Sequence, residues 1–476
     1  MALKIGTLAK NFLEGSSTSD TLYGDANGTL TGRSGAADLL YGYNGADFLY
    51  GDAKTLSTKA KGASDTIWAG YDGDTVYGDA YTMKSSAIGG ADKIYGEYGY
   101  DKLFGDARTM ANSAKGGADR IYGGYDNDML FGDAYSMTSN TIGGKDTLYG
   151  ENDNDTLYGD AYSMANYAIG GADTLSGGNH NDVLYGDAYG MSGKTRGGAD
   201  TINGDSGVDT LFGDARALSS YATGGDDLLK GGSSDDTIFG DGYQLTQWAV
   251  GGSDKLYGGS HNDRLYGDAY YLKDNARGGA DTLYGESGNN ILYGDALTMS
   301  GSSVGGNDTL HGNSGSDTIY GDAATLDNSS TGGHDYLNGS SGNDILYGDA
   351  NVTSPYAGYG NDTLIGGSGN DRLIGDSSYG GTGNDYLNGG TGNDTLDGGG
   401  GRDIFAFDAA SGKDTILYFR PGEDQIDIRA WRFGSFESLK MNQRAEYTVI
   451  YLSGTTHYIK LDGVLKAHLS AADFIL

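Results

Sequence analysis

Bulky apolar residues recur at short intervals along most of the chain, each flanked by glycine and polar residues. In the segment GKDTLYGENDNDTLY (144–158), Leu148 and Leu157 each lie two positions after an aspartate and directly before a tyrosine. This alternation predicts a short β-strand with one inward aliphatic residue. Such a strand is too short to be stable alone, so stacked copies are needed to bury a continuous aliphatic ladder between two sheets.

The pattern repeats with a fixed period of 27 residues. Three blocks of nine residues, approximately GGADTLYGG, SGNDTLYGD and AYSMxxxAx, make one unit, and twelve units fill residues 35–358. The aspartates of the three sequences GAD, ND and GDA are called here the GAD, ND and GDA aspartates. The period is set by the GAD aspartates Asp65, Asp92, Asp119, Asp146, Asp173, Asp200, Asp227, Asp254, Asp281, Asp308 and Asp335. Repetition over this length predicts a solenoid.

Two segments carry a resemblance to a known family. GSSGNDILY (339–347) and GGSGNDRLI (366–374) match the nonapeptide GGxGxDxUx, where U is a bulky apolar residue, of the repeats-in-toxin calcium-binding proteins. The resemblance implies an all-β, right-handed parallel β-roll or β-solenoid, in which two nonapeptides form a coil and calcium ions lie between turns. Here a nine-residue insert, such as AYSMANYAI (161–169), is added to each coil, which leaves the calcium sites of one edge in doubt.

The ND aspartates are the candidate metal ligands of the uninterrupted edge. Like charges stacked at the strand spacing of about 4.8 Å repel one another unless a cation lies between them. Calcium accepts six to eight oxygen ligands, which carboxylates and the main-chain carbonyls of a glycine-rich turn supply. The alternative is that these aspartates only form Asx turns. The candidates in the array are Asp47, Asp74, Asp101, Asp128, Asp155, Asp182, Asp209, Asp236, Asp263, Asp317 and Asp344, with Asn290 as the one break, and Asp362, Asp371, Asp385, Asp394 and Asp403 follow in GND or GRD contexts.

The position two residues before each ND aspartate holds residues that tolerate a positive φ. Examples are Gly45, Asp72, Asp153, His180 and His261. Glycine adopts this conformation freely, and aspartate and histidine are enriched among the other residues that do. His180 and His261 are therefore predicted to be turn residues, with metal ligation as the alternative.

The GDA aspartates precede the inserts and have two interpretations. Each is followed by Ala-x-x-Met/Leu-x-x-x-Ala, as expected for the N-cap of a short helical turn. Calcium ligation is the second interpretation, and both stand. The insert's Met or Leu is expected to pack against the roll. The GDA column comprises Asp52, Asp79, Asp106, Asp133, Asp160, Asp187, Asp214, Asp241, Asp268, Asp295, Asp322 and Asp349.

A stripe of aromatic residues is predicted to point outward from the second block. A stripe of this length needs a cover, which is either the Met or Leu of the insert or a partner surface or glycan. Its members are Tyr50, Tyr77, Phe104, Phe131, Tyr158, Tyr185, Phe212, Phe239, Tyr266, Tyr293, Tyr320 and Tyr347.

Composition narrows the functional classes. The chain of 476 residues has 87 Gly, 2 Pro and no Cys, and its 65 acidic and 31 basic residues give a net charge of -34. The acidic excess disfavours nucleic acid and anionic membranes as partners and favours cations. No apolar stretch is long enough to span a bilayer, and the first residues, MALKIGTLAKNFLEG, lack the features of a general secretory signal.

The two ends differ from the array. We expect an N-terminal cap with a first imperfect repeat (1–34), the twelve inserted repeats (35–358), uninserted nonapeptide repeats (359–403), and a small C-terminal β cap with a secretion signal (404–476). GRDIFAFDAASGKDTILYFRPGEDQIDIRAW (401–431) resembles the C-terminal cap of serralysin-type proteases, and EYTVIYL and THYIKL predict antiparallel strands. The terminal residues Asp473, Phe474, Ile475 and Leu476 resemble a type I secretion signal.

These observations favour a secreted, extracellular or cell-surface calcium-binding protein rather than an enzyme. The six histidines form no HExxH motif, and no nucleophile elbow is present, so no catalytic residue is assigned. The expected role is structural and self-assembling, at a cell surface or in an extracellular matrix, with folding on calcium binding after export. The alternative is an adhesin or ligand-binding module for a glycan, a host factor or ice. Expected partners are calcium, the type I secretion machinery, and the chain itself or a cell-surface or matrix polysaccharide.

Overall fold

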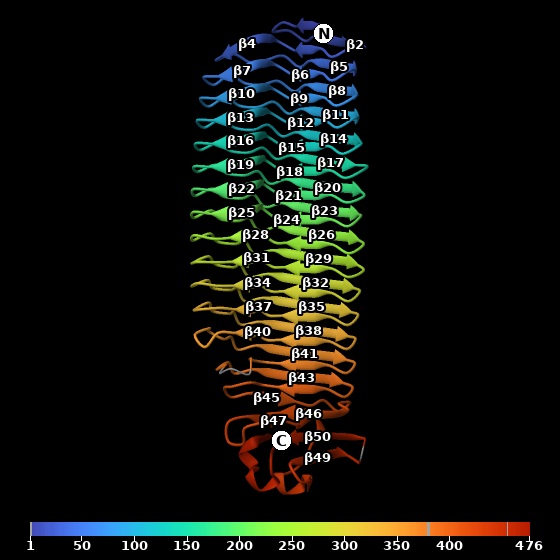
Figure 1. Ribbon diagram of the computed structural model, residues 1–476, viewed down its shortest axis with the longest axis vertical. Helices are drawn as coiled ribbons and strands as arrows, with labels where there is room; N and C mark the ends of the chain where they lie inside the picture. Colours follow the sequence, from blue (N-terminus) through green and yellow to red (C-terminus); the bar gives the residue numbers. More distant parts are fainter. Residues whose placement is uncertain (1, 378–380, 455) are drawn as a thin grey trace. The chain divides into compact units, whose positions relative to one another are not determined.

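The protein is built almost entirely from short β-strands (Figure 1). The computed structural model describes residues 2–377, 381–454 and 456–476. The chain divides into two compact units, residues 1–255 and 256–476. No helix among the described residues has the length and apolar character needed to cross a membrane.

Each coil of unit 1 contributes three strands. The first strand follows the GAD aspartate, the second follows the ND aspartate, and the third is the insert. The first strands are β2 (Phe12–Ser16), β5 (Leu39–Asn44), β8 (Thr66–Tyr71), β11 (Lys93–Tyr98), β14 (Arg120–Tyr125), β17 (Thr147–Glu151), β20 (Thr174–Asn179), β23 (Thr201–Ser206) and β26 (Leu228–Ser233). The second strands are β1 (Leu3–Ile5), β3 (Thr21–Tyr23), β6 (Phe48–Tyr50), β9 (Thr75–Tyr77), β12 (Lys102–Phe104), β15 (Met129–Phe131), β18 (Thr156–Tyr158), β21 (Val183–Tyr185), β24 (Thr210–Phe212) and β27 (Thr237–Phe239). The third strands are β4 (Ala26–Thr31), β7 (Ala53–Ser57), β10 (Ala80–Lys84), β13 (Ala107–Ala111), β16 (Ala134–Thr138), β19 (Ala161–Ala165), β22 (Ala188–Ser192), β25 (Ala215–Ser219) and β28 (Gly242–Leu245).

Unit 2 continues the same plan and then loses the third strand. Its first strands are β29 (Lys255–Ser260), β32 (Thr282–Ser287), β35 (Thr309–Ser314), β38 (Tyr336–Ser341), β41 (Thr363–Ser368), β43 (Tyr386–Thr391), β45 (Ile404–Ala406), β47 (Gln425–Asp427) and β51 (Phe474–Ile475). Its second strands are β30 (Arg264–Tyr266), β33 (Ile291–Tyr293), β36 (Thr318–Tyr320), β39 (Ile345–Tyr347), β42 (Arg372–Ile374), β44 (Thr395–Asp397) and β46 (Lys413–Leu417). Its third strands are β31 (Ala269–Leu272), β34 (Ala296–Met299), β37 (Ala323–Leu326) and β40 (Ala350–Thr353).

Within each unit, equivalent strands of successive coils pair in parallel and in register. Leu148 lies beside Leu175, Leu157 beside Leu184, and Met164 beside Met191. The central aliphatic residue of each first and second strand in the array, such as Leu148 and Leu157, is fully buried, as the alternation predicts. The predicted all-β solenoid of stacked parallel sheets is therefore confirmed.

The inserts are strands, so the prediction of a capped helical turn is wrong. Residues 161–165 pair with 134–138 on one side and with 188–192 on the other. A sheet neighbour in each adjacent coil satisfies backbone groups that an isolated helical turn would leave unpaired. The Met or Leu of the insert is buried as expected: Met164 is almost fully buried, whereas its strand neighbours Ser163 and Ala165 are half-buried.

The aromatic stripe of the second strands is buried, with Tyr77 and Phe131 exposed by 3% and 2%. The rings that contact it edge-on come from the second residue of the insert, as in the pairs Tyr77–Tyr81 and Tyr158–Tyr162. The cover is thus internal, and tyrosine contributes to it at a position that the sequence analysis did not single out.

The turns before the ND aspartates have the predicted left-handed conformation. Asp153 has a φ of 75°, His180 of 79° and Gly207 of 145°. The ring Nδ1 of His180 accepts the backbone N–H of Asp153 at 3.3 Å. His180 is therefore a turn residue whose ring stabilises the preceding coil.

The last part of unit 2 closes with an antiparallel hairpin, as predicted. Strand β49 (Tyr447–Ser453) pairs antiparallel with β48 (Lys440–Gln443) and β50 (His457–Asp462), and β50 pairs in parallel with β46. Four short 3-10 helices complete this region: η1 (Arg429–Trp431), η2 (Phe436–Ser438), η3 (Lys466–His468) and η4 (Ala471–Asp473).

Replacing Met164 with alanine tests whether the insert is part of the core. Met164 is buried, so its truncation should lower the free energy of unfolding by about 2–5 kcal/mol. Ser163→Ala, on the outward side of the same strand, should change it by about 0.5 kcal/mol or less. Urea-induced unfolding followed by circular dichroism measures both. Equal effects of the two substitutions would show that the third strand adds nothing to the core.

Candidate metal centres

The ND aspartates form a continuous ladder within each unit. The backbone N–H of Asp128 donates to Oδ1 of Asp155 at 2.7 Å, and the backbone N–H of Asp155 donates to Oδ1 of Asp182 at 2.7 Å. These side chains are buried at the turn that leads into the second strand. One carboxylate oxygen per coil is thus committed to the backbone of the preceding coil.

The second carboxylate oxygen of the ND aspartates has no hydrogen-bond partner among the described residues. This is so for the buried Oδ2 atoms of Asp128, Asp155 and Asp182. A Cβ added to Gly150 would lie 2.5 Å from Oδ2 of Asp155 and 2.5 Å from the carbonyl oxygen of Gly177. The glycine leaves room for a carboxylate oxygen and a carbonyl oxygen to face the same space.

The GAD aspartates form a second ladder with the same geometry. The backbone N–H of Asp146 donates to Oδ1 of Asp173 at 2.7 Å, and that of Asp173 to Oδ1 of Asp200 at 2.6 Å. Oδ2 of Asp146, Asp173 and Asp200 is buried without a hydrogen-bond partner. The sequence analysis used this column only to measure the period. Its signal was nevertheless present, because GGAD and SGND place an aspartate at the same nonapeptide position.

The structure assigns the predicted metal ligands to these two columns. Backbone donation to the next aspartate extends the ND column through Asp344, Asp371 and Asp394 to Asp414. Asp362, Asp385 and Asp403 belong instead to the GAD column. The ladder of unit 1 contains the predicted ND residues Asp47, Asp74, Asp101, Asp128, Asp155, Asp182, Asp209 and Asp236, and that of unit 2 contains Asp263, Asp317 and Asp344.

Asn290 keeps the ladder but lacks one charge. Its Oδ1 accepts the backbone N–H of Asp263 at 2.9 Å, and its own N–H donates to Oδ1 of Asp317 at 2.7 Å. Asparagine therefore preserves the hydrogen-bond register while replacing the second carboxylate oxygen with an amide.

The GDA aspartates make a different backbone contact, and Oδ2 of Asp187 and Asp214 is buried without a hydrogen-bond partner, so calcium ligation by this column stays a prediction. Both oxygens of Asp160 accept the backbone N–H of Gly171, at 2.9 and 3.1 Å, where the chain returns from the insert. The Asp160 carboxylate, directly before the insert, therefore binds the backbone of Gly171, just after the insert. Asp160 is not a helix N-cap. Burial raises the pKa of Asp160 to about 7.

Burial also raises the pKa of the ND aspartates above the ordinary value of about 3.9. The pKa rises to about 9 for Asp101, to about 8 for Asp155 and to about 6 for Asp209. The pKa values of Asp146 and Asp173 are raised even more strongly, again by burial first. Without a neutralising cation, burial therefore favours the protonated form of these groups.

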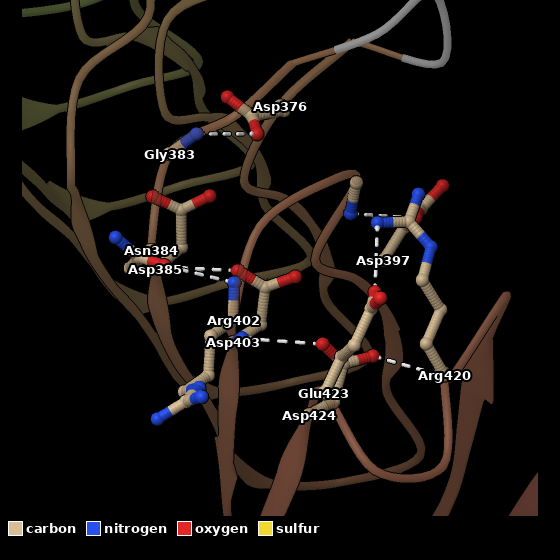
Figure 2. Close-up of polar contacts among 11 residues, drawn as sticks. Asp376, Gly383, Asn384, Asp385, Asp397, Arg402, Asp403, Arg420, Glu423 and Asp424 are labelled. Atoms are coloured by element: carbon tan, nitrogen blue, oxygen red, sulfur yellow. Dashed lines mark hydrogen bonds and ion pairs between the residues drawn. The ribbon is translucent and has the colours of Figure 1, made fainter.

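Figure 2 shows how the GAD ladder ends. The backbone N–H of Asp385 donates to Oδ1 of Asp403 at 3.1 Å, and that of Asp403 to Oδ1 of Asp424 at 3.2 Å. Arg420 donates its backbone N–H to Oδ2 of Asp424 at 2.7 Å and forms an ion pair with Glu423 at 3.9 Å. Burial raises the pKa of Asp403 to about 7, and the Arg420 guanidinium opposes this shift. The GAD column thus ends beside the positively charged side chain of Arg420.

The ligand chemistry fits a hard divalent cation. In the described part of the chain, three His, Cys, Asp or Glu side chains nowhere gather into a metal-binding cluster. A site must therefore combine aspartate oxygens with main-chain carbonyls, an all-oxygen set that suits calcium rather than zinc. In the ND and GAD columns, the buried Oδ2 atoms that lack a hydrogen-bond partner are the ligand oxygens that the aspartates would contribute to such a set.

Comparison with known families gives a match over most of the chain. The family model of the RTX calcium-binding nonapeptide repeat matches fifteen segments: 5–28, 29–53, 60–80, 87–107, 113–134, 143–161, 168–188, 195–215, 221–242, 248–269, 275–296, 303–324, 329–351, 356–378 and 379–416. The chain belongs to the repeats-in-toxin (RTX) family. Its repeats are therefore of a calcium-binding kind. A comparison with curated proteins gives no match.

Family membership gives the two ladders a common explanation. RTX repeats bind calcium, and an RTX solenoid is a structural rather than a catalytic kind of protein. Asp155 and Asp173 represent the two columns that would hold the ions through Oδ2, together with glycine carbonyls. The bound ions would supply the positive charge that the stacked carboxylates lack.

Calcium stoichiometry separates the three columns. We expect Asp155→Asn and Asp173→Asn each to reduce the number of bound calcium ions, because each removes an oxygen that has no hydrogen-bond partner. Asn290→Asp should increase the number, because it completes the ND column of unit 2. Isothermal titration of the three variants and of the parent measures these changes. Asp160→Asn is the control, and a loss of ions in that variant would show that the GDA column also binds metal.

The raised pKa values predict how the metal-free protein responds to pH. The folded state holds protons that the unfolded state releases between about pH 4 and pH 9, so stability rises as the pH falls through that range. The chelated protein should therefore have little β-sheet signal at about pH 9 and regain it towards about pH 5. Circular dichroism at several pH values in excess chelator tests this. A signal that falls steadily on acidification would contradict it.

Proposed function

We propose that this RTX protein is exported unfolded, folds when it binds calcium outside the cell, and serves as a structural, self-assembling component of a cell surface or extracellular matrix. The observation that carries the proposal is the pair of buried carboxylate ladders. These ladders need a neutralising cation. Calcium, the cation that RTX repeats bind, is scarce inside cells and abundant outside them. RTX repeat proteins are typically secreted, which agrees with this requirement.

The electrostatic cost explains why folding is coupled to the cation. Two unit charges about 4.8 Å apart repel by about 3.5 kcal/mol at an effective dielectric constant of about 20. Every coil adds one such neighbour to each ladder, so the ionised solenoid is destabilised along its whole length. Weak extracellular calcium sites work in the millimolar range, and binding energy at sites absent from the unfolded chain becomes folding energy.

An exposed aromatic stripe supports self-assembly. Tyr71, Tyr98 and Tyr125 stack on successive first strands with ring centroids 5.0 and 4.9 Å apart. About half of each side chain is exposed. Exposed aromatic patches of this kind mark protein contact surfaces. A second copy of the chain can offer the same flat stripe, so it is the partner that we propose.

Calcium should convert the chain from an unfolded monomer into a folded assembly. Far-ultraviolet circular dichroism should show β structure in millimolar calcium and lose it in excess chelator. Electron microscopy and light scattering of the loaded protein should show particles larger than one chain. Tyr98→Ser should reduce their size without changing the dichroism spectrum. An unchanged β signal after exhaustive chelation would sink the folding proposal, and a monodisperse monomer in calcium would sink the assembly proposal.

The segment from Asp473 to Leu476 is proposed to direct export. In the folded structure Phe474 and Ile475 form strand β51, which pairs with β47, and Oδ1 of Asp473 accepts the backbone N–H of Gly422 at 2.7 Å. A secretion machine would therefore read this segment only before the chain folds. This order agrees with folding outside the cell.

Substitution of the segment tests this route. Changing Phe474, Ile475 and Leu476 together to serine should trap the protein inside the cells that normally release it. Immunoblots of cells and medium measure the distribution. The control changes Phe436, which contacts Phe474 at 5.4 Å between ring centroids, to serine. Undiminished release of the triple variant, or equal retention of the control, would refute a signal at this segment.

A further inference from the structure

A groove runs along unit 1 between its second and third strands. It has a volume of about 510 Å³ and extends from Phe48 on β6 to Tyr162 on β19. One wall consists of Tyr81, Arg108, Tyr135 and Tyr162, which occupy the second position of successive inserts. Phe48, Thr75, Lys102 and Met129 line the other wall, from the successive second strands β6, β9, β12 and β15.

The insert wall is an ordered ladder with an arginine built into it. The guanidinium of Arg108 lies 5.2 Å from the ring centroid of Tyr135 and 5.9 Å from that of Tyr81. The rings of Tyr135 and Tyr162 stack at 4.9 Å. Cation–π contacts on both sides hold Arg108 in line with the aromatic rungs. Its charge is therefore positioned before any ligand arrives, which lowers the entropy cost of binding.

The floor of the groove is rigid and apolar. Tyr77, Phe104 and Phe131 stack on one another or on their neighbours and are almost fully buried. The rungs above them remain accessible, with Tyr81 exposed by 38% and Tyr135 by 37%. Because Arg108 and Tyr162 cover the two faces of Tyr135, and Tyr189 covers the other face of Tyr162, the groove presents ring edges and phenol groups, one rung per coil.

The charge of the groove is opposite to that of the chain. Among the described residues that line it, none is acidic, and two are the cations Lys102 and Arg108. The chain as a whole carries a net charge of -34. The arrangement recurs further along unit 1, where Arg216 lies 5.5 Å from the ring centroids of both Tyr189 and Tyr243. A carboxylate-free, cationic groove on so acidic a protein favours an anionic ligand.

We propose that this groove binds a linear acidic polysaccharide, with the sugar hydroxyls on the tyrosine phenol groups and the uronate carboxylates on Arg108 and Lys102. A phenol group donates to and accepts from sugar hydroxyls, and arginine binds a carboxylate through two parallel hydrogen bonds. An extended polymer can follow the groove from coil to coil. The polysaccharide contact does not depend on self-assembly through Tyr98.

The groove fits other polymers less well. The strands that line it are paired with a neighbour on each side, so a peptide cannot add to them as a further strand. Single-stranded nucleic acid binds through bases that stack on free aromatic faces, which the stacked rungs do not offer. Uronates carry hydroxyl groups that the phenol groups can bind and a carboxylate that suits the two cations.

Binding of a short uronate tests the proposal. The full chain in millimolar calcium is titrated calorimetrically with hexagalacturonate and with its methyl ester, and titration of the same calcium buffer without protein corrects for calcium binding by the sugar. We expect hexagalacturonate to bind and the ester to bind at least tenfold more weakly. Arg108→Gln, an exposed substitution, should weaken hexagalacturonate binding about tenfold. Arg120→Gln, on the outward face of β14, is the matched control and should have no effect.

Other outcomes of these titrations would contradict the proposal. Absence of binding to the parent, equal binding of the ester, or equal affinity of Arg108→Gln and the parent would each overturn the proposal. Tyr135→Ala provides a second variant, and its affinity should also fall while its circular dichroism spectrum matches the parent. If binding depends on Asp155 but not on Arg108, the sugar is held by calcium and the groove is not its site.

Discussion

The backbone N–H of each turn aspartate donates to a carboxylate oxygen of the equivalent aspartate one coil later, and the rest of the fold depends on this bond. It fixes the register between coils at two corners of every repeat, at 2.6–2.9 Å in the regular array. The same bond brings the carboxylates into two buried columns. The fixed register between coils and the crowding of carboxylate charges therefore have one origin. The protein cannot keep this register unless the carboxylate charges are neutralised.

Glycine makes the ladder possible at the corners. A Cβ on Gly159 would lie 1.6 Å from the carbonyl oxygen of Gly186 and 2.6 Å from Oδ2 of Asp173, so no other residue fits there. The high glycine content thus reflects close approach of one coil to the next more than flexibility. Because each corner has so little free space, ligand oxygens have to come from the carboxylates and the main chain rather than from additional side chains.

The sequence predicted the period, the stacked strands and the stacking of the ND aspartates, because each of these depends on a local pattern that repeats. Leu157 is inward and His180 is in a left-handed turn for reasons visible within one nonapeptide. The conformation of the insert was mispredicted because its strand depends on neighbours 27 residues away, whereas AYSMANYAI alone has a plausible helical pattern. The pairing of Asp160 with Gly171 was missed for the same reason, since it closes a loop of which neither end carries a distinctive motif.

The change in coil length along unit 2 shows what the ladder tolerates. The step between successive aspartates is 27 residues from Asp344 to Asp371, 23 from Asp371 to Asp394 and 20 from Asp394 to Asp414, yet the backbone-to-carboxylate bond persists through all three. Residues are lost from the third side of the coil, while the two corner aspartates stay 9 residues apart in the pairs Asp362–Asp371 and Asp385–Asp394 and are 11 residues apart in the pair Asp403–Asp414. Genetic insertion or deletion of a whole repeat, or of a single insert, therefore leaves the remaining coils in register. A gene with this organisation can lengthen or shorten its product by recombination between near-identical repeats, without disrupting the core of the remaining coils.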